Sequence, residues 1–149
     1  MPTHYSPEAA AKEPFLETVR ALVRTYQAFS SYSEAFVRQH SLTPAQFDVI
    51  ATLGNTNGMT MGEIGEKTLI TKGTLTGVVD RLIKKDLVTR EVPPENRRSV
   101  LVKLTHQGEQ IFQQVFPAHI ADMKEHFEAL EPSEIELLKT LLNRLGKVF

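Results

Sequence analysis

The sequence has no cysteine, which excludes a disulfide framework, a thiol nucleophile and a cysteine-based redox sensor. It has no apolar run near the ~18 residues of a membrane span. Residues 1–14, MPTHYSPEAAAKEP, lack the apolar core of a secretory signal peptide. Internal repeats and low-complexity segments are also lacking. We therefore expect one globular unit of 149 residues, without a membrane partner, in the reducing cytoplasm.

Catalytic signatures are missing as well. The five histidines are scattered, and no HExxH pair, glycine-rich phosphate loop or nucleophile motif accompanies them. The sequence therefore predicts no enzyme, no cofactor and no metal. One alternative stays open: His119 and His126 share a helix side with Asp122 between them, which is either a metal-sensing site or a pair of interface or solvated histidines.

Charge is nearly balanced over the chain, at −1, but unevenly distributed. Residues 67–103 hold nine Lys or Arg against four Asp or Glu, a net charge of +5, and the remainder carries −6. A basic middle between acidic ends favours a polyanion-binding surface, although an uneven solvated exterior gives the same count.

Both ends of the chain are predicted to be helical, because apolar residues recur there every three or four positions. One stripe comprises Phe15, Val19, Leu22, Tyr26, Phe29 and Phe36, a second Phe112, Phe116, His119, Met123, Phe127 and Leu130, and a third Leu138, Leu141, Leu145 and Val148. Pro117 predicts a kink, and a capping box at Ser133 and Glu136 predicts the start of the last helix. The apolar surface of these stripes is larger than a small central lobe can cover. We therefore expect residues 8–40 and 105–149 to form a homodimer interface.

The middle of the chain predicts short helices. Thr43 and Thr60 begin capping boxes with Gln46 and Glu63, and Thr71 caps a longer helix whose buried face holds Leu75, Val78, Val79 and Leu82. A turn at residues 68–70 makes the last two helices a helix-turn-helix. Two β-rich segments follow, residues 87–92 and 99–104, joined by residues 93–98. The expected fold is mainly α with a small β-hairpin: a winged helix-turn-helix lobe at residues 42–104, framed by N- and C-terminal dimerisation helices.

The helix after Thr71 has small residues opposite its apolar face, among them Gly73, Thr76 and Gly77. Small side chains let a helix approach the floor of the DNA major groove, and threonine offers a hydroxyl and a methyl group there. Thr71, Lys72 and Thr74 lie in the first turn, where free N–H groups favour phosphate. The alternative is that the glycines only permit tight helix packing. No arginine occupies a base-reading position, so DNA shape should contribute to specificity.

The loop VPPENRRSV, residues 92–100, presents Arg97 and Arg98 at the start of a strand. Successive strand residues point to opposite sides, so one arginine should reach a minor groove while the other contacts phosphate or braces the loop. Arg90 on the partner strand should contact the DNA backbone. The full set of expected DNA contacts is Thr71, Lys72, Gly73, Thr74, Thr76, Gly77, Arg81, Lys84, Arg90, Arg97 and Arg98.

Residues 42–112 resemble the MarR family of bacterial transcriptional regulators, through LTPAQFDVIATL, MTMGEIGEKTLITKGTLTGVVDRLIKKDLV and NRRSVLVKLTHQG. Asn96, Arg98, Val102, Leu104 and Thr105 fill the family's wing signature Asp-x-Arg-x-x-x-Val-x-Leu-Thr. The flanking helices agree with the family only in pattern, and we expect residues 1–149 to form a single MarR-like unit. It implies a homodimer that binds a pseudo-palindromic double-stranded operator, usually as a repressor, in the cytoplasm of a bacterium or archaeon and at its nucleoid.

Two positions depart from the family pattern. Asn96 replaces the usual aspartate, which in the family braces the wing through an arginine, so the charge-assisted part of that contact is lost. Asp86 stands where glycine commonly ends the recognition helix, and aspartate tolerates the left-handed conformation better than most residues.

The resemblance also implies release from DNA by a small phenolic or lipophilic anionic effector. We expect that effector to contact Tyr26, Phe29, Tyr32, Phe36, His40 and Phe47, with His40 or a tyrosine hydroxyl fixing the anion. The alternative is plain core packing, which a helical aromatic stripe more often indicates than a ligand pocket. Further alternatives are a metal-responsive regulator of the same fold, a regulator controlled by abundance or by a protein partner, and an interaction module without DNA binding.

Overall fold

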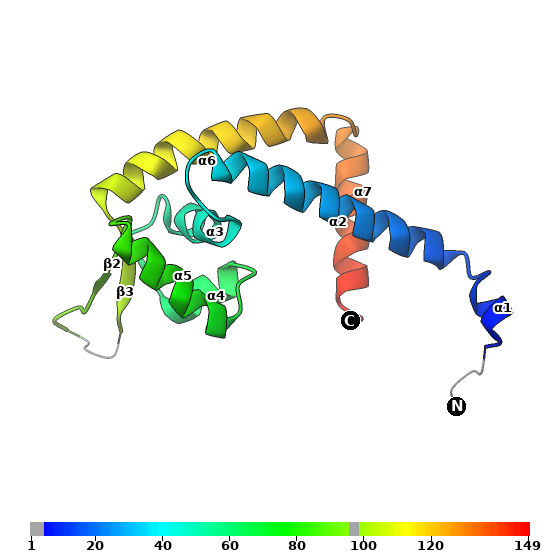
Figure 1. Cartoon of the computed structure of the whole chain (residues 1–149), viewed down its shortest axis with the longest axis horizontal. Helices are drawn as coiled ribbons and strands as arrows, with labels where there is room; N and C mark the ends of the chain where they lie inside the picture. The colour runs from blue at the N-terminus through cyan, green and yellow to red at the C-terminus, as the bar shows by residue number, and fades with distance from the viewer. Residues whose placement is uncertain (1–4, 96–98) are drawn as a thin grey trace. The chain divides into compact units, whose positions relative to one another are not determined.

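The structure, a computed structural model of the whole chain, describes residues 5–95 and 99–149 (Figure 1). The chain divides into two compact units, Met1–Pro44 and Ala45–Phe149. Each unit is built mainly of helices, and the one sheet belongs to the second. Within the described residues, no helix is both long and apolar enough to cross a bilayer.

The first unit consists of a short helix, α1 (Pro7–Ala10), and a long helix, α2 (Phe15–Arg38). The Ser6 side chain caps α1 by accepting a hydrogen bond from the Ala9 N–H at 3.1 Å. Helix α2 confirms the helix predicted from the first apolar stripe. The stripe is exposed from Phe15 to Phe29, whereas Val37 near the end of α2 is fully buried.

The second unit begins with the predicted short helices: α3 (Pro44–Leu53), α4 (Met61–Lys67) and α5 (Lys72–Lys84). Thr60 caps α4 by accepting a hydrogen bond from the Glu63 N–H at 3.2 Å, as its capping box predicts. Residues 68–71 form the turn between α4 and α5, so the helix-turn-helix is confirmed.

Helix α5 buries the predicted face, Leu75, Val78, Val79 and Leu82. Its C-terminus is a Schellman motif: the Asp86 N–H donates to the Ile83 carbonyl at 2.9 Å and the Leu87 N–H to the Leu82 carbonyl at 3.0 Å. Asp86 has φ 61°, the left-handed conformation that the sequence requires of it.

The sheet contains one more strand than predicted. Strands β2 (Val88–Glu91) and β3 (Leu101–Leu104) form the expected antiparallel hairpin. A two-residue strand, β1 (Met59–Thr60), pairs with the other edge of β3, which gives the order β1-β3-β2. The predicted hairpin is confirmed, but β1 was missed, because so short a strand has no alternating pattern and is defined by its partner.

Helix α6 (His106–Phe127) is fixed to the end of α5. The Thr105 hydroxyl accepts a hydrogen bond from the Gly108 N–H at 3.0 Å and donates to the Asp86 carbonyl at 2.6 Å. Gly108 is buried, and a Cβ there would overlap the Leu87 carbonyl oxygen, so this close approach requires glycine. The helix is unbroken at Pro117, where a kink is predicted, and its ribbon curves along its length (Figure 1).

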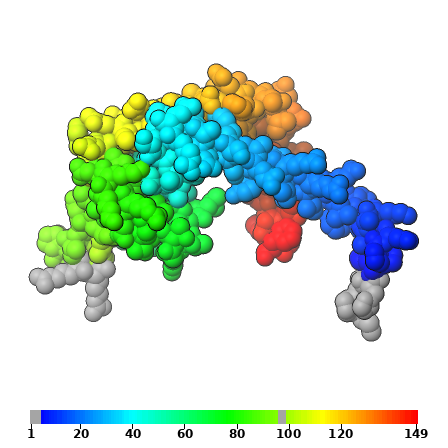
Figure 2. Space-filling view, in the orientation of Figure 1, coloured from blue at the N-terminus to red at the C-terminus, as the bar shows by residue number. Residues whose placement is uncertain are grey.

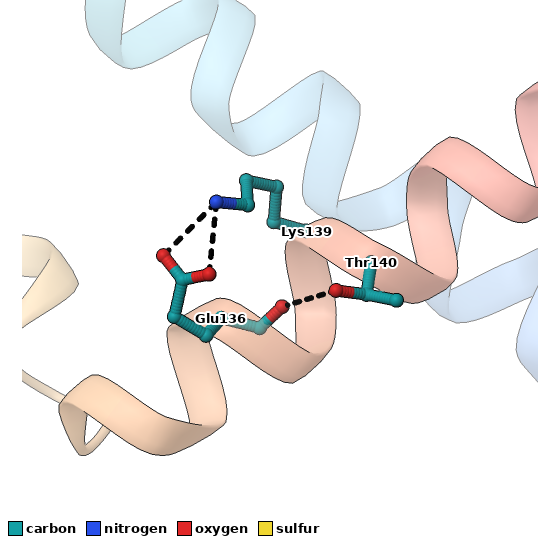
Figure 3. Close-up of polar contacts among 3 residues, drawn as sticks. All are labelled: Glu136, Lys139 and Thr140. Atoms are coloured by element: carbon teal, nitrogen blue, oxygen red, sulfur yellow. Dashed lines mark hydrogen bonds and ion pairs between the residues drawn. The ribbon is translucent and has the colours of Figure 1, made fainter.

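Helix α7 (Pro132–Gly146) starts one residue before the predicted cap at Ser133. The carboxylate of Glu134 accepts a hydrogen bond from the Glu131 N–H at 2.9 Å, and Pro132 occupies the first helical position. The predicted capping box was wrong because Pro132 needs no N–H partner and suits the first turn. Figure 3 shows the polar side of α7, where Lys139 binds the Glu136 carboxylate and the Thr140 hydroxyl donates to the Glu136 carbonyl.

Candidate nucleic-acid interface

The outward side of α5 is made of small side chains. Gly73 and Thr76 are exposed and Gly77 is half-buried. A Cβ added at Gly73 would meet no atom within 4 Å, so open space lies in front of this position. The green segment that includes α5 lies at the surface in Figure 2. The glycines therefore serve no close helix packing within the chain, which removes the main alternative to the DNA-facing interpretation.

The first turn of α5 carries Thr71, Lys72 and Thr74, all exposed. Thr71 occupies the N-cap with extended backbone, but its hydroxyl donates to the Thr74 hydroxyl at 3.1 Å and makes no capping bond. The first N–H groups of α5 are not satisfied by that side chain. Together with the helix dipole and the Lys72 ammonium, they form a surface that favours phosphate.

Arg81, Lys84 and Arg90 complete the described cations of the predicted interface, and all three are exposed. The guanidinium of Arg90, on β2, lies 2.6 Å from the carboxylate of Asp80 on α5. This ion pair joins the hairpin β2–β3, which is the wing of the predicted fold, to α5, its recognition helix. Arg90 is thus a link between two parts of the lobe as well as a candidate phosphate contact, a role that its position in the sequence did not indicate.

A second ion pair joins the two strands of the wing: the Lys103 ammonium lies 2.9 Å from the Glu91 carboxylate. Asn96, Arg97 and Arg98, the tip of the predicted wing, lie outside the described residues. Their expected role in the minor groove therefore stays a prediction.

Sequence reasoning missed two contacts that α3 makes to the ends of α5. The Gln46 side chain is 4 % exposed, and its carbonyl oxygen accepts a hydrogen bond from the Lys85 ammonium at 3.0 Å. The Asp48 carboxylate accepts one from the Leu69 N–H at 3.4 Å. Burial raises the pKa of the Asp48 carboxyl from its ordinary value of 3.8, and the bond from Leu69 opposes that rise. No local pattern marks these residues, because their partners are distant in the sequence.

The predicted effector residues fall in both units. In the first, Tyr26 is 68 % exposed, Phe29 is exposed, and Tyr32, Phe36 and His40 are half-buried. The rings of Phe36 and His40 lie 5.7 Å apart, one helical turn from each other. Tyr26, Phe29, Tyr32 and Phe36 lie on one side of the second half of α2, and His40 follows just after its C-cap.

The sixth predicted effector residue, Phe47, belongs to the second unit. Its ring packs edge-on against the imidazole of His119, 5.3 Å away at an interplanar angle of 81°. His119 is buried, and this burial lowers the pKa of its imidazole from 6.5, which the Asp122 carboxylate partly offsets. In the part of the chain that the structure describes, His119, Asp122 and His126 form no metal-binding cluster. His126 Nδ1 instead lies 2.9 Å from the Asp122 carbonyl.

Comparison with known proteins agrees with this architecture. Residues 42–100 match the model of the MarR family. The chain is 30% identical over 134 residues to the HTH-type transcriptional regulator MhqR of Bacillus subtilis, covering 90% of this chain and 92% of MhqR. Such relatives are named as transcriptional regulators and not as enzymes.

Two solved structures have the same fold. Bordetella bronchiseptica BpsR has a TM-score of 0.76 and 25% identity, with 98% of each chain covered. AbsC, a MarR family transcriptional regulator from Streptomyces coelicolor, has a TM-score of 0.81 and 21% identity, with 97% of this chain and 95% of AbsC covered. The exposed helix-turn-helix, the hairpin beside it and these similarities lead to one conclusion: the chain belongs to the MarR family and is a DNA-binding transcriptional regulator.

Proposed function

We propose that this regulator is a homodimeric repressor that binds a pseudo-palindromic operator and is released by a small aromatic anion. The observation that carries the proposal is the outward face of α5, where Gly73, Thr76 and Gly77 leave the helix backbone open to a DNA groove. In this proposal residues 42–104 are the DNA-binding lobe, and residues 8–40 and 105–149 supply the dimer interface.

On DNA, α5 of each copy would lie in a major groove, with Thr76 at the base edges and Lys72 at a phosphate. The wing arginines Arg97 and Arg98 would extend the contact toward the neighbouring minor groove. Chromosomal DNA as the target implies action in the cytoplasm, at the nucleoid. Phosphate contacts position the protein without reading sequence, whereas base contacts specify the site.

Exposed apolar surface supports a dimer. On α2, the side chains of Phe15, Val19 and Leu22 are exposed in the isolated chain. On α7, Leu138 and Leu141 are exposed on the side of the helix away from Glu136 and Lys139. Contiguous apolar faces of this kind are costly in water, and a twofold-symmetric partner would cover the same face of both copies.

An aromatic face with an imidazole suits a flat anionic ligand. His40 beside Phe36 can stack on a ring, and the imidazole or the Tyr32 hydroxyl can donate a hydrogen bond to a carboxylate. The similar BpsR has its DNA binding regulated by 6-hydroxynicotinic acid, a compound of this class. The proposed effector is therefore a hydroxylated aromatic carboxylate.

The test begins with selection of duplexes from a random pool by the purified full chain, followed by affinity measurements on the selected site. A palindromic consensus with two half-sites one helical turn apart is expected. Thr76→Ala should change base preference with little change in salt dependence, whereas Lys72→Ala should flatten the salt dependence by about one phosphate contact. Failure to enrich any sequence would refute the operator proposal.

The effector is tested separately, with 6-hydroxynicotinic acid as the probe. Binding should raise the melting temperature of the free protein and weaken operator binding, and both effects should be smaller in His40→Ala. A Gln39→Ala variant, at the exposed C-cap of α2 next to His40, is the matched control. If the probe changes neither quantity in the wild-type protein, a ligand of this class is excluded.

A further inference from the structure

Three consecutive residues of α3 make long-range contacts to three different elements. Gln46 binds the residue that ends α5, Phe47 packs against α6, and Asp48 binds the turn before α5. Adjacent helical residues point about 100° apart, so one turn of helix reaches three directions.

The contact at the C-terminal end is part-buried: Gln46 is buried, and Lys85 reaches it from the surface. Lys85 is the C-cap residue of α5, and its ammonium donates to the Gln46 oxygen at 3.0 Å. A charged donor strengthens a hydrogen bond, and burial of the Gln46 side chain shields it from water. This contact resists displacement of the last turn of α5.

The contact at the N-terminal end holds the backbone of the turn. The Leu69 side chain is 99 % exposed and adds no packing there. The Thr68 hydroxyl donates to the Ile64 carbonyl at 2.8 Å, which fixes the turn to α4. The bond from the Leu69 N–H to Asp48 joins residues 21 positions apart and so fixes the turn to α3.

We propose that Gln46 and Asp48 are positioning residues for DNA recognition: from α3 they fix both ends of the recognition helix, and Phe47 between them ties that orientation to α6. The proposal rests on α5 being the base-reading helix. A helix held at one end can pivot about it, whereas two anchors set both its position and its tilt. Base-edge hydrogen bonds tolerate only a few tenths of an ångström, so loss of either anchor should reduce sequence discrimination before it reduces general DNA affinity.

The first measurement needs no DNA. Amide hydrogen exchange of the free full-length protein should become faster at Leu69 in Asp48→Ala, with the core amides of α5 unchanged. Asp48→Asn keeps a side-chain acceptor oxygen and should preserve the wild-type exchange rate. Unchanged exchange at Leu69 in Asp48→Ala would overturn the proposal whatever the DNA result.

The second measurement is the ratio of affinities for the selected operator and for a scrambled duplex, at one salt concentration. Gln46→Met keeps the side-chain volume but loses the acceptor, and Asp48→Ala loses the other acceptor. Each should lower the ratio about twofold to tenfold, the range of one hydrogen bond. Asp48→Asn should stay within about twofold of wild type.

Thr52→Val is the matched control, since it removes a hydroxyl from a half-buried residue of the same helix at equal volume. It should leave the ratio unchanged, and thermal melting is recorded for every variant. The proposal is overturned if the affinity ratio is unchanged in Gln46→Met and Asp48→Ala. It is also overturned if the ratio falls as much in Asp48→Asn and Thr52→Val as in those two variants. If the wild-type protein selects no operator, the function proposed above fails, while the exchange measurement still decides whether Asp48 anchors the turn.

Discussion

The ion pair between Asp80 and Arg90 places a negative charge on the surface proposed to meet DNA. The two groups are 2.6 Å apart, and their side chains are 48 % and 37 % exposed. We predict that Asp80→Asn strengthens non-specific DNA binding, because it removes a carboxylate near the phosphates and releases Arg90 to contact one of them.

The magnitudes separate the effect on folding from the effect on binding. An exposed ion pair stabilises a protein by about 0.2–1 kcal/mol, so the variant should fold with nearly unchanged stability. One additional phosphate contact steepens the plot of log affinity against log salt by about 0.9. At about 0.1 M salt, counterion release from one contact corresponds to a gain of roughly five- to tenfold in non-specific affinity.

The assay is fluorescence anisotropy with a scrambled duplex between about 50 and 200 mM salt. Glu125→Gln, which removes one negative charge from an exposed position on α6, is the matched control and should leave the slope unchanged. The double variant Asp80→Asn/Arg90→Gln should return to the wild-type slope, since the released cation is then gone. The reasoning is refuted if Asp80→Asn leaves the slope unchanged, or if the double variant keeps the steeper one.

Three further predictions concern other parts of the chain. Gly77→Ala should raise the free energy of unfolding by about 0.5–1 kcal/mol, because alanine favours a helix over glycine and its Cβ would meet only Arg81 Nη1, at 3.8 Å. The same methyl group should weaken operator binding, because it fills the surface proposed to face the DNA groove. Unchanged operator affinity, measured by fluorescence anisotropy, would contradict this. Leu141→Lys should weaken a homodimer about 100-fold or more, because the change occurs in both copies at roughly 1.5–3 kcal/mol each, whereas Thr140→Lys on the polar side should not; light scattering against concentration distinguishes them. Stability should fall as the pH drops below 6.5, because His119 then binds a proton in the unfolded chain but not in the folded one, where burial lowers its pKa. In His119→Phe the melting temperature should fall less over the same pH range. An identical fall in both proteins would exclude this cause.

The helices of the DNA-binding lobe were predictable because their signals are local. Thr60 is three residues from the Glu63 N–H that it caps, and the buried face of α5 repeats within thirteen residues. In these cases the interacting residues are closer in sequence than the length of one helix, so a short stretch of sequence contains both of them. The left-handed conformation of Asp86 was expected from the family resemblance, since glycine commonly ends the recognition helix at this position.

The features that the sequence did not predict depend on distant residues or on backbone geometry. Strand β1 exists because Met59 lies opposite Val102, 43 positions further along the chain. The start of α7 was misplaced because two overlapping capping patterns compete there, and Pro132 decides in favour of the earlier one. The pattern of polar and apolar residues predicts neither feature, because β1 depends on a distant partner strand and the start of α7 depends on backbone geometry.

The basic surface shows most clearly what a residue count leaves out. Residues 67–103 carry a formal charge of +5, but Arg90 is held by Asp80 and Lys103 by Glu91. Lys85 donates a hydrogen bond to the amide oxygen of Gln46, which ties its ammonium to a buried side chain of α3. The count therefore treats as equivalent three cations that make different contacts: two form ion pairs with carboxylates, and one donates to an amide oxygen. In the proposed complex, the field that steers DNA toward α5 would depend on the exposed Lys72, Arg81 and Lys84, together with Arg97 and Arg98.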